Sequence, residues 1–216
     1  LGIPLRVFAK GEEYLELVKH PRHGHGSGMN PCIDCRIFTF SRARVLMEEI
    51  GADFIATGEV LGERPMSQRR QAMDTIERES GLTGRIVRPL SAQLLPPSLP
   101  EQNGLVDRSR LLAVQGRCRK PQIGLADSYG LKDYPCPAGG CLLTDQEYAV
   151  KLRDLLEREP EFGMADARLL MLGRHFRLPS GARVVVGRNQ HENQQLEKAA
   201  RSGDSLLSPV GVPGPT

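Results

Sequence analysis

The first half of the chain alternates short apolar segments with longer amphipathic ones. Residues 3–9, 53–57 and 85–90 are short and apolar, which is typical of buried strands in a parallel sheet. The segments between them predict helices over residues 12–19, 35–50 and 67–79, and Gly51 ends the second while Ser67 is a candidate cap for the third. This alternating order predicts an α/β fold with a doubly wound parallel sheet.

The second half is less regular. Three prolines make residues 94–104 an irregular loop, and residues 108–115 and 121–129 are predicted helices. A helix start at residues 144–147 leads into an amphipathic helix over 148–159. Beyond residues 160–163 the pattern changes to strands at 175–178 and 183–186, joined by Pro179-Ser180-Gly181, and a polar helix at 190–201. We therefore predict a first domain over residues 1–159 and a small α+β domain over 160–216.

Composition places the chain among ordinary soluble proteins. It has 216 residues, of which 39% are hydrophobic and 25% charged. No apolar run reaches the length of a membrane span and no signal peptide is visible, so we expect a cytoplasmic protein with no membrane association and reduced cysteines. The first residue is Leu1 and the chain stops without a terminal helix, so we expect a fragment of a longer protein.

Four of the five cysteines form two pairs framed by proline or glycine. Cys32 and Cys35 are three residues apart, and Cys136 and Cys141 follow about a hundred residues later. Such thiols hold an iron–sulfur cluster, form a closed structural zinc site, or act without metal as a persulfide and its resolving thiol. The spacing favours a metal and leaves cluster and zinc open. Cys118 has no partner nearby and is assigned a structural role.

The histidines offer a weaker metal signal. His20, His23 and His25 are closely spaced, but their glycine neighbours and the lack of carboxylates around them favour a mobile loop. The chain contains no Ser/His/Asp arrangement that predicts nucleophilic catalysis, and no carboxylate pair suited to acid–base catalysis.

Basic residues are unevenly distributed although the net charge is only +3. Two groups suit a phosphate-rich partner, but solvated helix faces have a similar composition. The first group contains Arg64, Arg69, Arg70, Arg85 and Arg88, and the second contains Arg108, Arg110, Arg117, Arg119 and Lys120.

The end of the strand at residues 53–57 is the predicted ligand-binding edge. In an open parallel sheet, ligands bind outside the carboxyl ends of the strands, where Thr57, Gly58, Glu59 and Gly62 are found here. Glycines allow the backbone to approach a ligand closely, although the same glycines could simply turn a loop. The cysteine pair precedes the helix that leads into this strand, so the two sites are predicted to lie close together.

These residues resemble a known family. Cys32-x-x-Cys35-Arg36, the Thr57-Gly58-Glu59 segment and Ser67-Gln68 resemble the PP-loop domain of tRNA 4-thiouridine synthases, and Asn30-Pro31-x4-Cys35 is similar to tRNA 2-thiouridylases. The resemblance covers about residues 1–159 and implies an adenine nucleotide alpha-hydrolase-like fold of PP-loop type. Enzymes of this family use ATP to adenylate a tRNA uridine at its carbonyl oxygen and then replace that oxygen with sulfur.

The resemblance also implies roles for particular residues. Cys35 matches the sulfur-handling cysteine, Cys32 the additional ligand of cluster-bearing members, and Cys141 or Cys136 the distal cysteine. Thr57, Gly58, Glu59 and Gly62 are expected near ATP and its Mg²⁺. A sulfur donor protein or sulfide is expected to supply the sulfur, and tRNA is the expected partner.

The C-terminal segment carries a second resemblance. Phe176-Arg177-Leu178, Gly181-Ala182 and Val184-Val185-Val186-Gly187-Arg188-Asn189 resemble the start of an NFACT-type RNA-binding domain. Arg188 is the candidate phosphate contact here. In the first domain the candidate RNA contacts are Arg64, Arg69, Arg70, Arg117, Arg119 and Lys120.

The chain departs from the PP-loop family in several places. The phosphate-binding Ser-Gly-Gly-x-Asp-Ser loop and the N-terminal RNA-binding module of 4-thiouridine synthases do not occur in this sequence, and the spacing from Gly62 to Ser67-Gln68 is one residue longer. The expected function is ATP-dependent tRNA thiolation by the complete protein. The alternatives are a zinc-stabilised, non-catalytic RNA-binding protein of translation or ribosome quality control, and a less favoured thiol redox protein.

Overall fold

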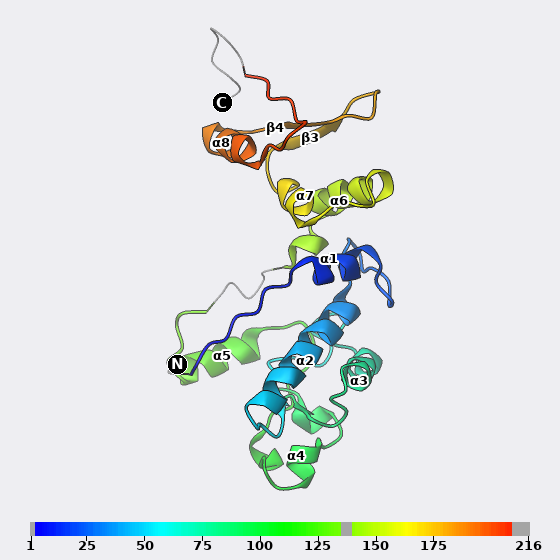
Figure 1. Ribbon diagram of the computed structural model, residues 1–216. Coiled ribbons are helices and arrows are strands. Elements are labelled where there is room, and N and C mark those ends of the chain that lie inside the picture. Colours follow the sequence, from blue (N-terminus) through cyan, green and yellow to red (C-terminus); the bar gives the residue numbers. More distant parts are fainter. Residues whose placement is uncertain (1–2, 135–139, 209–216) are drawn as a thin grey trace. The chain divides into compact units, whose positions relative to one another are not determined.

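The computed structural model describes residues 3–134 and 140–208 (Figure 1). Packing divides these residues into two compact units. Unit 1 comprises residues 3–19, 27–29 and 141–208, and unit 2 comprises residues 20–26, 30–134 and 140. Within the described residues no helix is both long and apolar enough to span a bilayer.

Unit 2 contains a small parallel sheet covered by two helices. Strands β1 (Ile55–Ala56) and β2 (Ile86–Val87) pair in parallel, with Ile55 opposite Ile86. Helices α2 (Cys32–Glu49) and α3 (Arg70–Glu79) pack together beside the sheet. The core between these elements is formed by Phe40, Met47, Ile76, Leu82 and Ile86. Two further helices complete the unit, α4 (Leu99–Gln102) and α5 (Lys120–Ser128).

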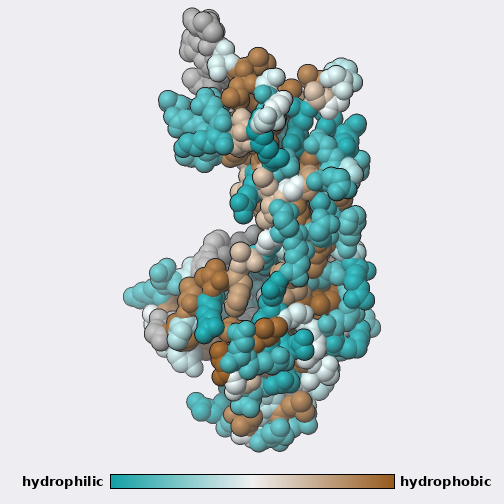
Figure 2. Space-filling view, viewed as in Figure 1, coloured by the Kyte–Doolittle hydropathy of each residue, from teal (hydrophilic) through white to brown (hydrophobic). Residues whose placement is uncertain are grey.

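Unit 1 contains four helices and a β-hairpin. Its elements are α1 (Glu12–Lys19), α6 (Gln146–Arg158), α7 (Met164–Leu169), β3 (Arg174–Arg177), β4 (Arg183–Val186) and α8 (Gln190–Ala199). The strands β3 and β4 are antiparallel, with Phe176 opposite Val184. Helix α8 buries no residue, and Figure 2 shows hydrophilic residues over its surface.

The core of unit 1 forms along α6. Tyr148, Leu152 and Leu155 recur at intervals of three and four residues, so one face of the helix is buried. The Asp145 side chain accepts a hydrogen bond from the Tyr148 backbone N–H at 2.8 Å and caps the helix. The Tyr148 hydroxyl donates to the Ala167 carbonyl at 3.0 Å, which ties α6 to α7. Leu15, Val18, Met29, Phe162 and Leu170 complete this core.

Two sequence predictions of elements are wrong. Residues 3–9 form no strand; Leu5 is 86% exposed, and the described residues provide no neighbouring strand for this segment. Residues 108–115 form one 3₁₀ turn (Arg108–Arg110) and then an extended segment. The N–H groups of Leu112 and Val114 donate to the carbonyls of Pro89 and Leu90, so pairing with the chain after β2 replaces the helix.

Other predicted elements shift by a few residues. Helix α3 begins after Arg69, because Ser67 is buried before the helix starts and does not cap it. The Pro-rich segment 94–104 includes the short helix α4, whose start is capped by Ser98 and Glu101. The structure describes only a two-stranded parallel pair in unit 2, so the doubly wound sheet stays a prediction. The predicted domain boundary at residues 160–163 also stays a prediction. In the structure, α6, which precedes that boundary, belongs to the same compact unit as the hairpin that follows it.

Candidate functional site

The Cys32–Cys35 pair occupies the first turn of α2. Both thiols are half-buried, and neither forms a disulfide. The buried Asn30 side chain donates from Nδ2 to the Cys32 sulfur at 3.1 Å. The Asn30 amide therefore positions the Cys32 sulfur at the start of the helix.

A histidine upstream holds the cysteine motif in place. The His23 backbone N–H donates to Asp34 Oδ2 at 3.0 Å, and ring Nδ1 lies 3.0 Å from Asp34 Oδ1. Ring Nε2 lies 3.4 Å from Glu79 Oε1 on α3. The prediction of a mobile His/Gly loop is therefore wrong at His23. Asp34 lies inside the Cys-x-x-Cys motif, and a carboxylate at that position is the feature of the sequence that could have indicated a partner for His23.

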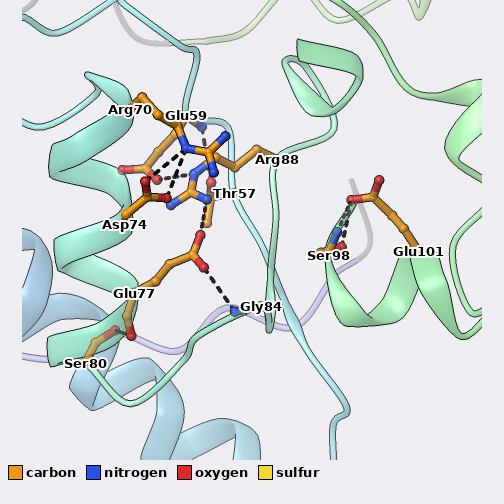
Figure 3. Close-up of polar contacts among 10 residues, drawn as sticks. All are labelled: Thr57, Glu59, Arg70, Asp74, Glu77, Ser80, Gly84, Arg88, Ser98 and Glu101. Atoms are coloured by element: carbon orange, nitrogen blue, oxygen red, sulfur yellow. Dashed lines mark hydrogen bonds and ion pairs between the residues drawn. The ribbon is translucent and has the colours of Figure 1, made fainter. Parts of the chain in front are cut away.

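The carboxyl ends of β1 and β2 meet at a buried ion-pair network (Figure 3). Glu59 follows β1 and is 3% exposed; Arg88 follows β2 and is 5% exposed. Arg88 Nε donates to Glu59 Oε2 at 3.0 Å, and its Nη1 donates to Glu77 Oε1. Glu77 also accepts from the Gly84 N–H at 3.1 Å. The predicted ligand-binding edge therefore carries paired charges: Glu59 follows β1, Arg88 follows β2, and Glu77 lies in α3.

This network also contacts the cysteine helix. Arg36, the residue after Cys35, places its Nε 3.3 Å from Glu59 Oε1. The Thr57 hydroxyl accepts from the Glu59 N–H at 3.3 Å, and a Cβ added at Gly58 would meet nothing within 4 Å. The thiol pair and the strand edge are thus neighbours within unit 2, with open space beside the backbone at Gly58.

A β-bridge pairs the segment just before Arg64 with the segment just before Arg117. Leu61 pairs in parallel with Gln115, and the Gly116 N–H donates to the Leu61 carbonyl at 2.8 Å. Gly62 has φ +77°, and a Cβ there would lie 3.7 Å from Gly116. Its N–H donates to the Gln68 carbonyl at 2.7 Å. In this structure Gly62 turns the loop.

Four exposed cations flank this bridge along the chain, and we refer to them as the basic surface: Arg64 and Arg69 from the first group, and Arg117 and Lys120 from the second. No carboxylate among the described residues pairs with them. The remaining predicted RNA contacts of this unit are paired. Arg119 lies 2.8 Å from Glu63, and Arg70 lies 3.0 Å from Asp74.

Arg188 is also engaged. Its Nη2 donates to the Gly173 carbonyl at 3.0 Å, and its Nη1 lies 3.6 Å from Glu192. Asn189 caps α8 by accepting from the Glu192 N–H at 2.9 Å. The Gly-Arg-Asn turn therefore braces the junction between the hairpin and α8, and a phosphate contact by Arg188 stays a prediction.

The two distal cysteines do not belong to the described part of unit 2. Cys141 is exposed and belongs to unit 1, where it precedes the 3₁₀ turn Leu142–Thr144. Cys136 lies outside the described residues. Within residues 3–134 and 140–208, no group of three His, Cys, Asp or Glu side chains could hold a metal ion. A complete cluster or zinc site therefore stays a prediction.

Ion pairs in unit 1 stabilise two aspartates in their charged form. Burial alone would raise the pKa of Asp154, but Arg177 and Arg158 hold it below its ordinary value. Burial would likewise raise the pKa of Asp166, whereas hydrogen bonds from the Gly163 N–H, Arg201 and Arg183 lower it. The stability that these carboxylates contribute is present above pH 3.8 and is lost as the pH falls through their lowered pKa values.

His175 predicts a second pH dependence, at higher pH. Burial, followed by the charges of Lys151 and Arg183, lowers the pKa of His175 from 6.5. The unfolded chain then binds a proton at His175 more readily than the folded chain does. The contribution of neutral His175 to the free energy of unfolding is therefore fully present above pH 6.5 and decreases as the pH falls below that value. Between pH 7 and pH 5, the free energy of unfolding measured with urea should decrease less for His175→Phe than for the unchanged protein. His191→Gln, on exposed α8, is the control; an equal loss in both variants contradicts the prediction.

Two comparisons with known proteins point to RNA. Residues 173–216 match the family model described as the NFACT protein RNA binding domain. A 62-residue segment is 44% identical to the tRNA-specific 2-thiouridylase MnmA of Syntrophotalea carbinolica, covering 27% of this chain and 18% of that protein. The chain thus matches less than a fifth of the length of that relative. No solved structure matches the chain.

Proposed function

We propose that the complete protein thiolates a uridine of tRNA in an ATP-dependent reaction. One observation carries the proposal: Arg36 links the helix that bears Cys32 and Cys35 to Glu59 at the carboxyl edge of β1 and β2. Sulfur-handling thiols and a nucleotide-binding edge would then serve one substrate. The partial similarity to a tRNA-specific 2-thiouridylase and the RNA-binding domain match support the same substrate class.

In this proposal, Cys35 delivers the sulfur. Cys35 lies in the first turn of α2, and the Asn30 amide donates to the neighbouring Cys32 sulfur at 3.1 Å. In the metal-free form of the proposal, the outer sulfur of a Cys35 persulfide would attack the activated uridine carbon and displace AMP. The Cys141 thiol would then attack the Cys35 sulfur, which releases the thiouridine and leaves a Cys35–Cys141 disulfide. Sulfide would open that disulfide to restore the Cys35 persulfide and the Cys141 thiol, whereas reloading by a sulfur donor protein requires the disulfide to be reduced first.

ATP with Mg²⁺ would bind beside β1 in the complete protein. The open space at Gly58 fits an approaching ligand, and the Thr57 hydroxyl lies at the same loop. The Glu59 carboxylate is occupied by Arg36 and Arg88, so in this arrangement Glu59 positions those cations. ATP would supply the adenylate that activates the uridine oxygen.

An iron–sulfur cluster would be held by Cys32, Cys35 and Cys141, with Cys136 as the alternative distal ligand. Thiolates suit soft metals, and both thiols of the first pair are half-buried on one helical turn. This is the alternative to the persulfide chemistry, because a cysteine that ligates iron is not free to carry a persulfide; the cluster would supply soft iron sites for sulfur. Unit 2 provides two of the required thiolate ligands, Cys32 and Cys35, so the residues described there fit an iron–sulfur cluster only in part.

The test is tRNA thiolation by the complete protein carrying Cys35→Ser. We expect thiouridine formation, measured by mass spectrometry of digested tRNA, to fall by roughly a thousandfold or more, as on removal of a catalytic nucleophile. Cys118→Ser is the matched control, because Cys118 is exposed and lies outside both cysteine pairs. Unchanged thiolation by Cys35→Ser would refute the assignment.

A zinc-stabilised RNA-binding protein of translation or ribosome quality control is the second candidate. It is favoured by the buried Glu59–Arg88 pair, which fills the carboxyl edge of the sheet with mutually neutralised charge. Metal and acid-labile sulfide analysis of protein purified without oxygen separates the two. Iron with sulfide supports thiolation, whereas stoichiometric zinc without sulfide supports the binding protein.

A further inference from the structure

His23 contacts both oxygens of the Asp34 carboxylate. Its backbone N–H donates to Oδ2 at 3.0 Å, and its ring Nδ1 lies 3.0 Å from Oδ1. An ionised carboxylate can only accept, so Nδ1 carries the hydrogen of this bond. Asp34 is 5% exposed and lies eleven positions further along the chain. One residue of the preceding loop therefore fixes both oxygens of a buried carboxylate.

Asp34 lies between the two thiols of unit 2. Cys32, Asp34 and Cys35 belong to the first turn of α2, and Asp34 is the acidic residue of that turn. The Cys35 N–H donates to the Pro31 carbonyl at 2.8 Å, which closes the turn. A displacement of Asp34 is therefore transmitted to both cysteines through the backbone of a single helical turn.

Loss of the ring bond would leave Asp34 short of partners. An unpaired buried charge is costly, so the carboxylate would turn toward other donors. Among the described residues no side chain caps the start of α2, and the first backbone N–H groups of a helix have no partner within it. A released Asp34 would compete for these N–H groups and change the geometry of the turn that carries both thiols.

The second ring nitrogen of His23 makes a weaker contact. Nε2 lies 3.4 Å from Glu79 Oε1, a distance longer than an ordinary N–H···O hydrogen bond. Glu79 also lies 3.5 Å from Arg22 and 3.4 Å from Arg78, so it keeps two cations when His23 is replaced. The bond to Asp34 is therefore the contact through which His23 acts on the cysteines.

We propose that His23 is a positioning residue for sulfur transfer. Through Asp34 it holds the turn that carries Cys32 and Cys35 in the geometry that transfer requires, and it exchanges no group with the substrate itself. The inference rests on the proposed function, because it assigns His23 a part in thiolation.

Two replacements of His23 separate its ring contacts. In His23→Asn the amide nitrogen takes the place of Nδ1 and still donates to Asp34, whereas in His23→Gln it takes the place of Nε2 and does not. His20→Gln is the matched control, because His20 is exposed at the start of the same loop.

The first test measures kcat and KM of tRNA thiolation by the complete protein. We expect His23→Gln to lower kcat by roughly 10- to 100-fold, the range for loss of a residue that orients a functional ligand, with KM for tRNA unchanged. His23→Asn should retain most of kcat, and His20→Gln all of it. Equal losses of kcat in His23→Asn and His23→Gln, or full activity of both, would overturn the proposal. A raised KM with unchanged kcat would also overturn it, because His23 would then serve tRNA binding.

The second test does not depend on thiolation. In the full chain labelled with ¹³C at the cysteine Cβ atoms, Cys→Ser variants assign the Cys32 and Cys35 resonances, and the exposed Cys118 serves as internal reference. Both resonances should move in His23→Gln and keep their positions in His23→Asn, while that of Cys118 stays in place in both.

These two tests distinguish failure of the inference from failure of the proposed function. Unmoved cysteine resonances in His23→Gln overturn the positioning role, whether or not the protein thiolates tRNA. Absence of thiolation in the unchanged protein, together with moved resonances in His23→Gln, overturns the proposed function and supports the hold of His23 on the cysteine turn.

Discussion

Replacing Arg88 by methionine will lower the free energy of unfolding by about 3–5 kcal/mol, because removal of one partner leaves buried charges uncompensated. Arg88 binds both Glu59 and Glu77, and these carboxylates come from different elements (Figure 3). Without the guanidinium, Glu59 keeps only the half-exposed Arg36 at 3.3 Å. The measurement is urea unfolding at pH 7, followed by circular dichroism.

Two further variants make this prediction specific. Arg70→Met removes an exposed i,i+4 pair with Asp74 and should cost less than about 0.5 kcal/mol. The double replacement Glu59→Leu with Arg88→Met removes both charges and should recover part of the lost stability, because apolar groups of similar size tolerate burial. A loss for Arg88→Met as small as that for Arg70→Met would show that the buried pair contributes little.

The affinity for RNA will fall by about 50-fold between 50 and 200 mM salt if the four cations of the basic surface each contact a phosphate. This follows from a slope of about −0.7 in log K against log salt for each contact with single-stranded nucleic acid, taken over a fourfold change in salt. The four cations, Arg64, Arg69, Arg117 and Lys120, are exposed and flank the Leu61–Gln115 bridge along the chain. Anisotropy titrations of labelled RNA against the full chain measure the slope.

Single variants assign the contacts. Arg64→Gln and Arg117→Gln should each reduce the slope by about 0.7. Arg78→Gln is the control, because Arg78 is also exposed on unit 2 but lies on α3 beside Glu79. Salt-insensitive binding, or equal effects of all three variants, would argue against the basic surface as the RNA contact.

The elements that the sequence predicted well depend on local signals. Helix α1 begins and ends at the predicted residues, and β4 occupies the predicted segment 183–186. Helix α6 follows from the Asp145 cap and the periodic burial of Leu152 and Leu155. Caps and periodicity act over a few residues, so a sequence states them directly.

The wrong predictions concern segments whose state depends on a distant partner. Residues 3–9 have strand composition, yet a strand forms only where a neighbour accepts its hydrogen bonds. Residues 108–115 have helical composition, yet the carbonyls of Pro89 and Leu90 hold Leu112 and Val114 in an extended segment. Composition alone carries no information about these partners.

The sequence by itself determined the cysteine motif at a helix start, the strand edge at Thr57–Glu59 and the presence of two basic groups. Only the tertiary structure decided that Glu59 pairs with Arg88, that His23 holds Asp34, and which arginines stay unpaired. The reason is physical: residue type and spacing set local conformation and chemistry, whereas burial and charge pairing depend on segments that folding brings together.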